Sequence, residues 1–436
     1  MAWSLLLALM FLALLALFAS GLPVAFAFML INIAGFIVFV GGLDSLSLLI
    51  GSAFDSVASF PLVPIPLFIL MGEILLRSGL AALTIDAVDR WVGRLPGRLS
   101  VVTTGAGTIF AALSGSSMAT TAMFASTLTP EMVRRGYKPQ LSVASVLAAG
   151  GLAVLIPPSA LAVLLAVLAS VSVAKLLIAS IVPGLMLAAI YVLYFPLRVL
   201  IQPHLAPDAE PVAVALRDRI RSLMHLVPLA LLMLVVTGFI FLGIATPSET
   251  AAMGAVASAL VAAAYGRLNV AVLRESLLAT AKVTAIVLLI IIGSKAYSQL
   301  LAISGVAAQF VQFATELQLL PIVKVAGMML VVFILGMFID QISIMLITVP
   351  IFMPIVVQMG MDPIWFSVCM LINLELAGIT PPFGLQLFVM KGVRPEFALT
   401  DIYMAALPIV VIQALVIAFL MLFPPVVAWL PSLMLQ

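Results

Sequence analysis

The sequence predicts an all-α protein that crosses a membrane many times, and two observations carry this prediction. Hydrophobic residues make up 65% of the 436 residues and charged residues only 8%, too few to cover a water-exposed surface. The apolar residues form runs of roughly 20, which suits helical spans and exceeds the strands of a membrane barrel. These runs lie at 3–19, 22–41, 60–76, 141–170, 176–197, 223–243, 249–265, 283–303, 365–390 and 402–423.

The first run is expected to be retained as a span. It lacks the positively charged start and the small-residue cleavage site of a signal peptide, and "SGLPVAF" leads directly into the second run. The single cysteine, Cys369, excludes an internal disulfide and is expected to be a small packing residue. The net charge of +2 is spread over short loops, so no nucleic-acid partner is indicated.

Lysine and arginine residues sort to one side when the runs are threaded through a bilayer, and cytoplasmic loops carry such an excess. Most of the 19 lie in segments 77–98, 132–140, 198–222, 266–282 and 391–396. Residues 43–59 and both termini are then expected on the opposite face. The threading requires re-entrant helical hairpins at 100–131 and 324–357, the first opening to the cytoplasm and the second to the other side.

An internal repeat relates the two halves of the chain. Adding 224 to four prolines of the first half gives four prolines of the second: Pro130, Pro139, Pro157 and Pro158 become Pro354, Pro363, Pro381 and Pro382. Because the two hairpins open to opposite faces, we expect an inverted-topology repeat. Its parts are residues 1–201 (hairpin 100–131, broken helix 141–170), a cytoplasmic linker 202–222, and residues 223–436 (hairpin 324–357, broken helix 365–390). Secondary transporters have this architecture; a duplicated scaffold is the alternative.

Two Pro-Pro pairs, in "AVLIPPSA" and "AGITPPFG", interrupt the broken helices. Consecutive prolines lack amide protons and end a helix, so carbonyl groups one turn upstream lose their partners. Such oxygens suit a hard cation such as Na⁺. The N-termini of the half-helices beyond the breaks would attract an anionic substrate. The residues expected beside that substrate are Ser116, Pro158, Pro381 and Pro382.

Asp340 stands in "GMFIDQISIM", at the tip of the second hairpin, where the first hairpin has Ser116. A carboxylate at membrane depth is costly unless paired or ligated, which marks a functional site. Two interpretations stay open: a ligand or supporting anchor of a coupling-cation site, or a cap of the second hairpin helix. Glu73, Lys295 and Glu375 also lie in predicted spans, and functional and packing roles are equally supported for them; one arrangement is an ion pair between Glu73 and Lys295.

Five separated motifs resemble the large transmembrane subunit (DctM-type) of tripartite ATP-independent periplasmic (TRAP) transporters over nearly the whole chain. They are "SGSSMATTAMFASTLTPEMVRRGY", "IPPS", "TPSETAAMGA", "GMFIDQISIMLITVPIFMPI" and "GITPPFGLQLFVMKG". The resemblance implies a bacterial or archaeal inner-membrane protein that uses a Na⁺ gradient and an elevator-like motion to import an organic anion, such as a C4-dicarboxylate, a sialic acid or a sugar acid. It implies two partners, a separate small four-helix membrane subunit (DctQ-type) and a periplasmic substrate-binding protein (DctP-type), and no organic cofactor.

Carried over by position, the resemblance also implies two Na⁺ sites. The first would be formed by Ser114, Ser117, Ala153, Ile156 and Pro157. The second would be formed by Gly336, Asp340, Ala377 and Thr380. Many relatives have glycine where Ala153 and Ala377 stand, which affects how tightly the chain can turn there.

Other function classes fit less well. An intramembrane protease needs a base beside its serine or a second membrane aspartate. His204 and His225 lie in or beside the linker rather than at membrane depth, and the predicted spans contain no second aspartate. A channel would show a ring of pore-lining charge rather than two matched half-sites. No enzyme is therefore predicted. A stand-alone Na⁺/anion symporter of related fold stays as the alternative, and independence from a binding protein would distinguish it.

Overall fold

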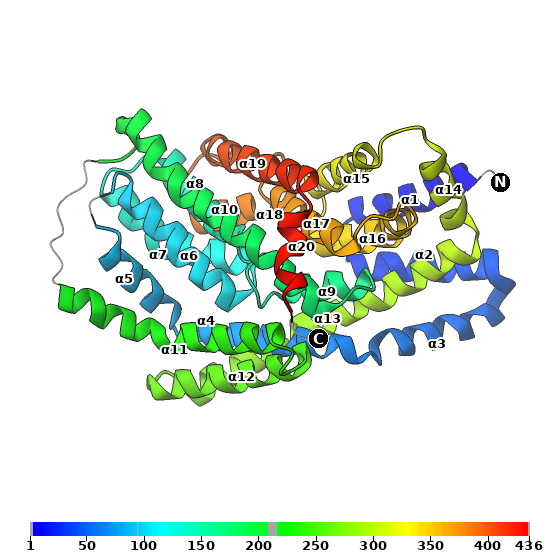
Figure 1. Ribbon diagram of the computed structural model, residues 1–436. Coiled ribbons are helices and arrows are strands. Elements are labelled where there is room, and N and C mark those ends of the chain that lie inside the picture. The colour runs from blue at the N-terminus through cyan, green and yellow to red at the C-terminus, as the bar shows by residue number, and fades with distance from the viewer. Residues whose placement is uncertain (1–2, 94, 208–215, 435–436) are drawn as a thin grey trace.

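The protein is all-helical in the computed structural model, which describes residues 3–93, 95–207 and 216–434 (Figure 1). Over these ranges every regular element is a helix, so the all-α prediction is confirmed. Within them, six segments are long and apolar enough to cross a membrane: Val24–Val57, Phe60–Arg77, Val173–Ile201, Val270–Ile303, Gln341–Gln358 and Leu399–Leu422. The chain is a multi-pass membrane protein.

The elements of the first half are α1 (Trp3–Ala19), α2 (Val24–Phe36), the π-helix η1 (Ile37–Gly41), the 3-10 helices η2 (Gly42–Ser45) and η3 (Phe60–Leu62), α3 (Leu46–Val57), α4 (Pro64–Arg77), α5 (Ala81–Trp91), α6 (Arg98–Ser114), α7 (Ser117–Arg134), α8 (Pro139–Gly150), α9 (Ala160–Leu168) and α10 (Val173–Ile201). The 3-10 helix η4 (Pro203–Leu205) opens the predicted linker 202–222, of which 208–215 lie outside the described residues. The linker prediction stays a prediction.

The elements of the second half are α11 (Leu216–Phe241), α12 (Pro247–Ala264), α13 (Val270–Ile303), α14 (Val306–Glu316), α15 (Pro321–Gly336), α16 (Gln341–Gln358), α17 (Pro363–Gly378), α18 (Leu385–Val393), α19 (Leu399–Leu422) and α20 (Pro425–Ser432). The predicted hairpins correspond to α6–α7 and α15–α16. The predicted broken helices correspond to α8–α9 and α17–α18. Each of these four pairs is interrupted where the sequence predicts.

Helix boundaries follow the repeat offset. The bounds of α7 and α16 differ by 224 residues at both ends, and both Pro-Pro pairs form a cis peptide bond. Gly136 and Gly360, also 224 residues apart, both adopt positive φ in the turns that follow these helices. The two halves thus build the same sequence of local structures. Their inverted sense and the domain boundaries stay predictions.

Two segments differ from the sequence prediction because helices extend further than the apolar runs. The run at 22–41 continues through η1 and η2 into α3, so most of 43–59 is helical. The segment 266–282 is helical from Val270, because Asn269 caps α13 by accepting a hydrogen bond from the Val272 amide at 2.8 Å. No glycine or proline interrupts 270–292, so charged residues there lie on a helix rather than in a loop.

The long helix α13 runs beside α2, α3 and α4 along one side of the molecule (Figure 1). The hairpins and broken helices lie together on the other side, where α7 packs against α18 and α8 packs against α19. Elements of the two halves are therefore interleaved, and the two hairpin tips come close to the same buried region. Cys369 is a free, buried residue of α17, as predicted.

Candidate functional site

The tip of the first hairpin is a tight turn between α6 and α7. Gly115 ends α6 in the left-handed region, with φ of 57°, and a Cβ there would lie 3.3 Å from the Pro158 carbonyl oxygen. Ser116 is the N-cap of α7, since its hydroxyl accepts a hydrogen bond from the Ala119 amide at 3.3 Å. The Ser114 and Thr120 hydroxyls are 2.9 Å apart. The tip is thus uncharged, rich in hydroxyls, and pressed against the Pro-Pro break.

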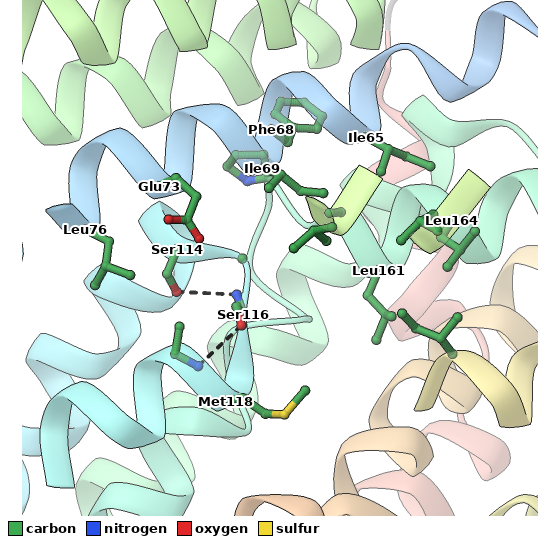
Figure 2. A pocket seen from close by; sticks show the side chains of 18 residues that line it. Ile65, Phe68, Ile69, Glu73, Leu76, Ser114, Ser116, Met118, Leu161 and Leu164 are labelled. Carbon is green, nitrogen blue, oxygen red and sulfur yellow. Dashed lines mark hydrogen bonds between the residues drawn. The ribbon is translucent and has the colours of Figure 1, made fainter. Parts of the chain in front are cut away.

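A cavity of about 270 Å³ opens at this tip (Figure 2). Its walls come from α4, the α6–α7 tip, the start of α9 and α13, and they are mainly apolar. Polar groups are contributed by Glu73, Ser114 and Ser116, and Figure 2 shows the Glu73 carboxylate directed toward Ser114. The N-terminus of α9, capped by Ser159, also borders the cavity beside Pro158. Two helix N-termini therefore lie at one cavity, an arrangement that favours an anion.

The first break, residues 151–159, leaves oxygens without partners. In the described part of the chain no hydrogen-bond donor reaches the carbonyl oxygens of Ala153, Ile156 or Pro157. Gly115 brings the hairpin tip against this break, so the predicted ligands of the first cation site belong to adjoining segments. The donor set of carbonyl and hydroxyl oxygens fits Na⁺. One predicted ligand, Ser117, donates its hydroxyl proton to Glu375 at 2.6 Å, which leaves the lone pairs of the hydroxyl oxygen available to a cation.

The second hairpin tip differs in its cap. Asp340 is the N-cap of α16, and its carboxylate accepts hydrogen bonds from the Ser343 amide, at 3.1 Å, and from the Ser343 hydroxyl. These are the contacts of the capping interpretation. A carboxylate has about four acceptor positions, so the cap leaves room for a cation, and the ligand role of Asp340 stays a prediction.

Other predicted ligands of the second site also meet across the hairpin and the break. Gly336 packs so closely on Ala377 that a Cβ at 336 would lie 2.1 Å from the Ala377 Cβ. The Ala377 carbonyl already accepts from the Thr380 amide at 3.1 Å, and the Thr380 hydroxyl donates to the Leu376 carbonyl at 2.6 Å. The Ala377 carbonyl oxygen retains one lone pair, and the Thr380 hydroxyl, which donates, retains both. The second site is more fully hydrogen-bonded than the first.

A buried carboxylate joins the two hairpins. Glu375 of α17 has no exposed surface and accepts hydrogen bonds from Ser117 at 2.6 Å, Gln341 at 2.9 Å and Gln386 at 2.8 Å. Thr121 donates to the other end of the Gln386 amide at 3.3 Å. The sequence left the role of Glu375 open and did not single out the two glutamines. Their position in the sequence could have identified them. Each is a polar residue within an apolar stretch and lies in the first turn of a helix, Gln341 after the second hairpin tip and Gln386 after the second break.

The suggested ion pair between Glu73 and Lys295 is absent from the described structure. Glu73 instead pairs with Arg77, one turn along α4, at 2.7 Å, and Arg77 reaches Glu275 of α13 at 3.0 Å. Arg77 lies four residues from Glu73 on the same helix, a spacing that favours an ion pair. Lys295 lies on α13 beside two further cavities.

Comparison with known proteins supports a family assignment. Residues 11–426 match the family model described as the tripartite ATP-independent periplasmic transporter, DctM component. The chain is 36% identical, over 89% of its length and 90% of the relative, to the C4-dicarboxylate TRAP transporter large permease protein DctM of Pseudomonas aeruginosa. It is 32% identical to the isethionate TRAP transporter permease protein DctMQ of Oleidesulfovibrio alaskensis over 85% of its length, but spans only 60% of that protein.

The fold also has a solved counterpart. The crystal structure of the Alcanivorax borkumensis YdaH transporter matches with a TM-score of 0.63 and 16% identity, over 97% of this chain and 98% of that one. At this identity the likeness concerns the fold alone. Together with the match across 11–426, the six apolar helices and the interrupted helix pairs, the sequence relatives show that the chain belongs to the DctM family of large permease subunits of TRAP transporters, multi-pass proteins of the inner membrane.

Proposed function

We propose that this chain imports an organic anion across the inner membrane and that a Na⁺ gradient drives the import. The observation that carries the proposal is the cavity at the first hairpin tip, where the N-termini of α7 and α9 meet. Backbone amides at helix N-termini bind carboxylates without a fixed cation. The Glu73 carboxylate at the rim pairs with Arg77, which offsets part of its charge and is itself shared with Glu275.

Na⁺ is proposed as the co-transported ion. The carbonyl groups near Ala153 and Pro157, with Ser114 and Ser117, would hold it in the first half, and Asp340 with groups around Ala377 and Thr380 in the second. Bound there, it would add positive charge beside the anion. The proposal is supported by the unpartnered carbonyl oxygens of the first break and by a carboxylate at the second tip.

We further propose that the substrate is delivered by a periplasmic binding protein and that a small four-helix subunit completes the permease. The family description names a periplasmic transporter of three components, and one relative is named as a DctMQ permease. The hairpins and broken helices, packed as one group against α13 and its neighbours, are the proposed moving part of an elevator-like motion.

Uptake into proteoliposomes tests this function. The chain is reconstituted with its small subunit and binding protein, and radiolabelled acids are offered from the classes named for the relatives, among them C4-dicarboxylates, isethionate, ectoine and 2,3-diketo-L-gulonate. We expect one acid to accumulate only with an inward Na⁺ gradient. Equal uptake with K⁺ or choline would refute Na⁺ coupling. Equal uptake without the binding protein would favour the stand-alone symporter.

A further inference from the structure

Two cavities separate from the hairpin tip meet at Lys295. The larger, about 520 Å³, is bordered by the ends of α9 and the starts of α4, α10 and α12, and the smaller, about 180 Å³, by α3 and α13. Lys295, Ser59 and Val167 line both. Their polar lining is dominated by hydroxyl groups: Ser52, Ser56, Ser59, Ser170, Ser172 and Thr246.

Lys295 is a cation within an apolar span. It lies in the apolar helix α13 and is half-buried, yet it forms no ion pair or hydrogen bond with any residue that the structure describes. A charged side chain inside an apolar span is costly, and such residues face cavities and mark the route of a substrate or ion. Asp55 borders the smaller cavity but not the larger one, so the field of the ammonium group is least opposed on the side of the larger cavity.

The Lys295 cavities and the hairpin-tip cavity lie along the same helices. On α4, Pro64 lines the larger Lys295 cavity and Ile65 lines the hairpin-tip cavity; on α9 the corresponding residues are Ala166 and Leu164. On α13, Val287 precedes Lys295 by eight residues, which corresponds to about 12 Å along a helix. The cavities therefore follow one another along α4, α9 and α13, with the hairpin-tip cavity toward one end and the Lys295 cavities toward the other.

We propose that Lys295 and the hydroxyl-lined cavity around it form an anion-binding vestibule, a first site that takes the carboxylate of an organic anion before it reaches the hairpin tip. The vestibule rests on the proposed function, since it supplies that function with its substrate. It lies on the face of residues 43–59, which the charge distribution predicts to be periplasmic. In the larger cavity its chemistry is a single lysine ammonium beside neutral hydroxyl donors, with the starts of α10 and α12 at its border.

Thiol labelling of the full-length chain, purified with its small subunit, tests the vestibule without requiring transport. Ser59→Cys, in a Cys369→Ala background, is treated with an anionic (2-sulfonatoethyl) and a cationic (2-trimethylammonioethyl) methanethiosulfonate. We expect Lys295→Gln to lower the anionic-to-cationic rate ratio at least about threefold, the effect of one charge a few ångströms away in a largely aqueous cavity. Asp55→Asn should raise it, and Lys295→Arg should retain it. An unchanged ratio in Lys295→Gln overturns the proposal.

A second arm tests carboxylate binding itself. Millimolar succinate should slow labelling of Ser59→Cys, the uncharged analogue succinamide should not, and the protection should be lost in Lys295→Gln. Equal effects of succinate and succinamide would overturn the proposal. Ser47→Cys, an exposed position on α3 outside both cavities, is the matched control and should respond to none of these changes. A wild-type chain that fails Na⁺-driven uptake but passes both labelling arms would refute the proposed function and leave the vestibule standing.

Discussion

The two hairpin tips have the same backbone form and different surroundings. Ser116 caps α7 and Asp340 caps α16 at equivalent positions, each through a hydrogen bond from the amide three residues on. The first tip borders a cavity of about 270 Å³, whereas the space beside the second is about 10 Å³, room for one water molecule at most. The first tip is neutral and borders the larger cavity; the second carries a carboxylate and adjoins a much smaller one.

The two Pro-Pro breaks also differ in how many of their carbonyl groups are hydrogen-bonded. In the first break the carbonyl oxygens of Ala153, Ile156 and Pro157 lack donors in the described structure. In the second, the Thr380 carbonyl accepts from the Gly384 amide and the Pro382 carbonyl accepts from the Tyr403 hydroxyl at 2.8 Å. A repeat thus conserves the geometry of the backbone and leaves the side chains free to specialise. In this chain the larger cavity lies at the tip of the first half, and the carboxylates at the second tip and in the network between the hairpins, Asp340 and Glu375, come from the second half.

The strongest test of the comparison is the predicted inverted sense. Arg134 and Gln358 are the last residues of α7 and α16, and both are exposed. In a Cys369→Ala background, an impermeant thiol reagent added to intact cells should label Gln358→Cys and leave Arg134→Cys unlabelled, since the hairpins open to opposite faces. Both should label after lysis. Labelling of both, or of neither, on intact cells would show that the halves are not inverted.

The next largest effect is expected where the halves join. Glu375→Leu would leave the buried donors of Ser117 and Gln386 without an acceptor, at about 1–3 kcal/mol each, and would leave Gln341 with the Leu374 carbonyl alone. We therefore expect a loss of about 3 kcal/mol and a clear fall in the thermal midpoint in detergent. The thermal midpoint of Glu375→Gln should fall less, because the amide oxygen of the new side chain still accepts a hydrogen bond. Glu396→Gln, an exposed partner of Arg394, is the control. A Glu375→Leu chain as stable as this control would mean that the network does not hold the hairpins together.

The two caps separate structural from cation-binding roles. Asp340→Ala and Ser116→Ala should each cost about 1 kcal/mol of stability from the lost cap. Only Asp340→Ala should also weaken the apparent Na⁺ affinity of uptake, about ten- to a hundredfold, because a contact to a charged group contributes about 1.5–3 kcal/mol. Asp340→Asn retains a capping oxygen and should behave like Asp340→Ala toward Na⁺. Normal Na⁺ dependence in Asp340→Asn would leave Asp340 with the cap alone.

The smallest effect is expected at the C-terminal end of α7, the end of the first hairpin that lies farthest from its tip. Glu131 pairs with Arg134 and Arg135, both at 2.6 Å, but these arginine side chains are 76% and 46% exposed. Glu131→Gln should therefore change stability by less than about 1 kcal/mol, and the difference should shrink further in 1 M salt. Ile355 occupies the equivalent place in the second half and has no charge to lose. A larger, salt-independent loss would show that this end of the hairpin is buried in the assembled transporter.

Sequence reasoning worked where the signal is local. The ends of α7 and α16 and the breaks of α8–α9 and α17–α18 follow from caps and prolines, which act within one turn of the helix. It was less accurate for α3 and the start of α13, because polar residues interrupt the apolar run without breaking the helix. The contact between Gly336 and Ala377 was expected only through the family resemblance.

The sequence by itself determined that the chain is helical, crosses a membrane, is repeated at an offset of 224 residues, and carries two Pro-Pro breaks and an aspartate at a hairpin tip. Only the tertiary structure decided that Ser117 meets Glu375, 258 residues away, that Glu73 pairs with Arg77 rather than with Lys295, and that the larger cavity lies at the first hairpin tip. The physical reason is range. Hydropathy, prolines and caps act on neighbouring residues, whereas the partner of a buried polar group and the space beside it depend on how distant helices pack.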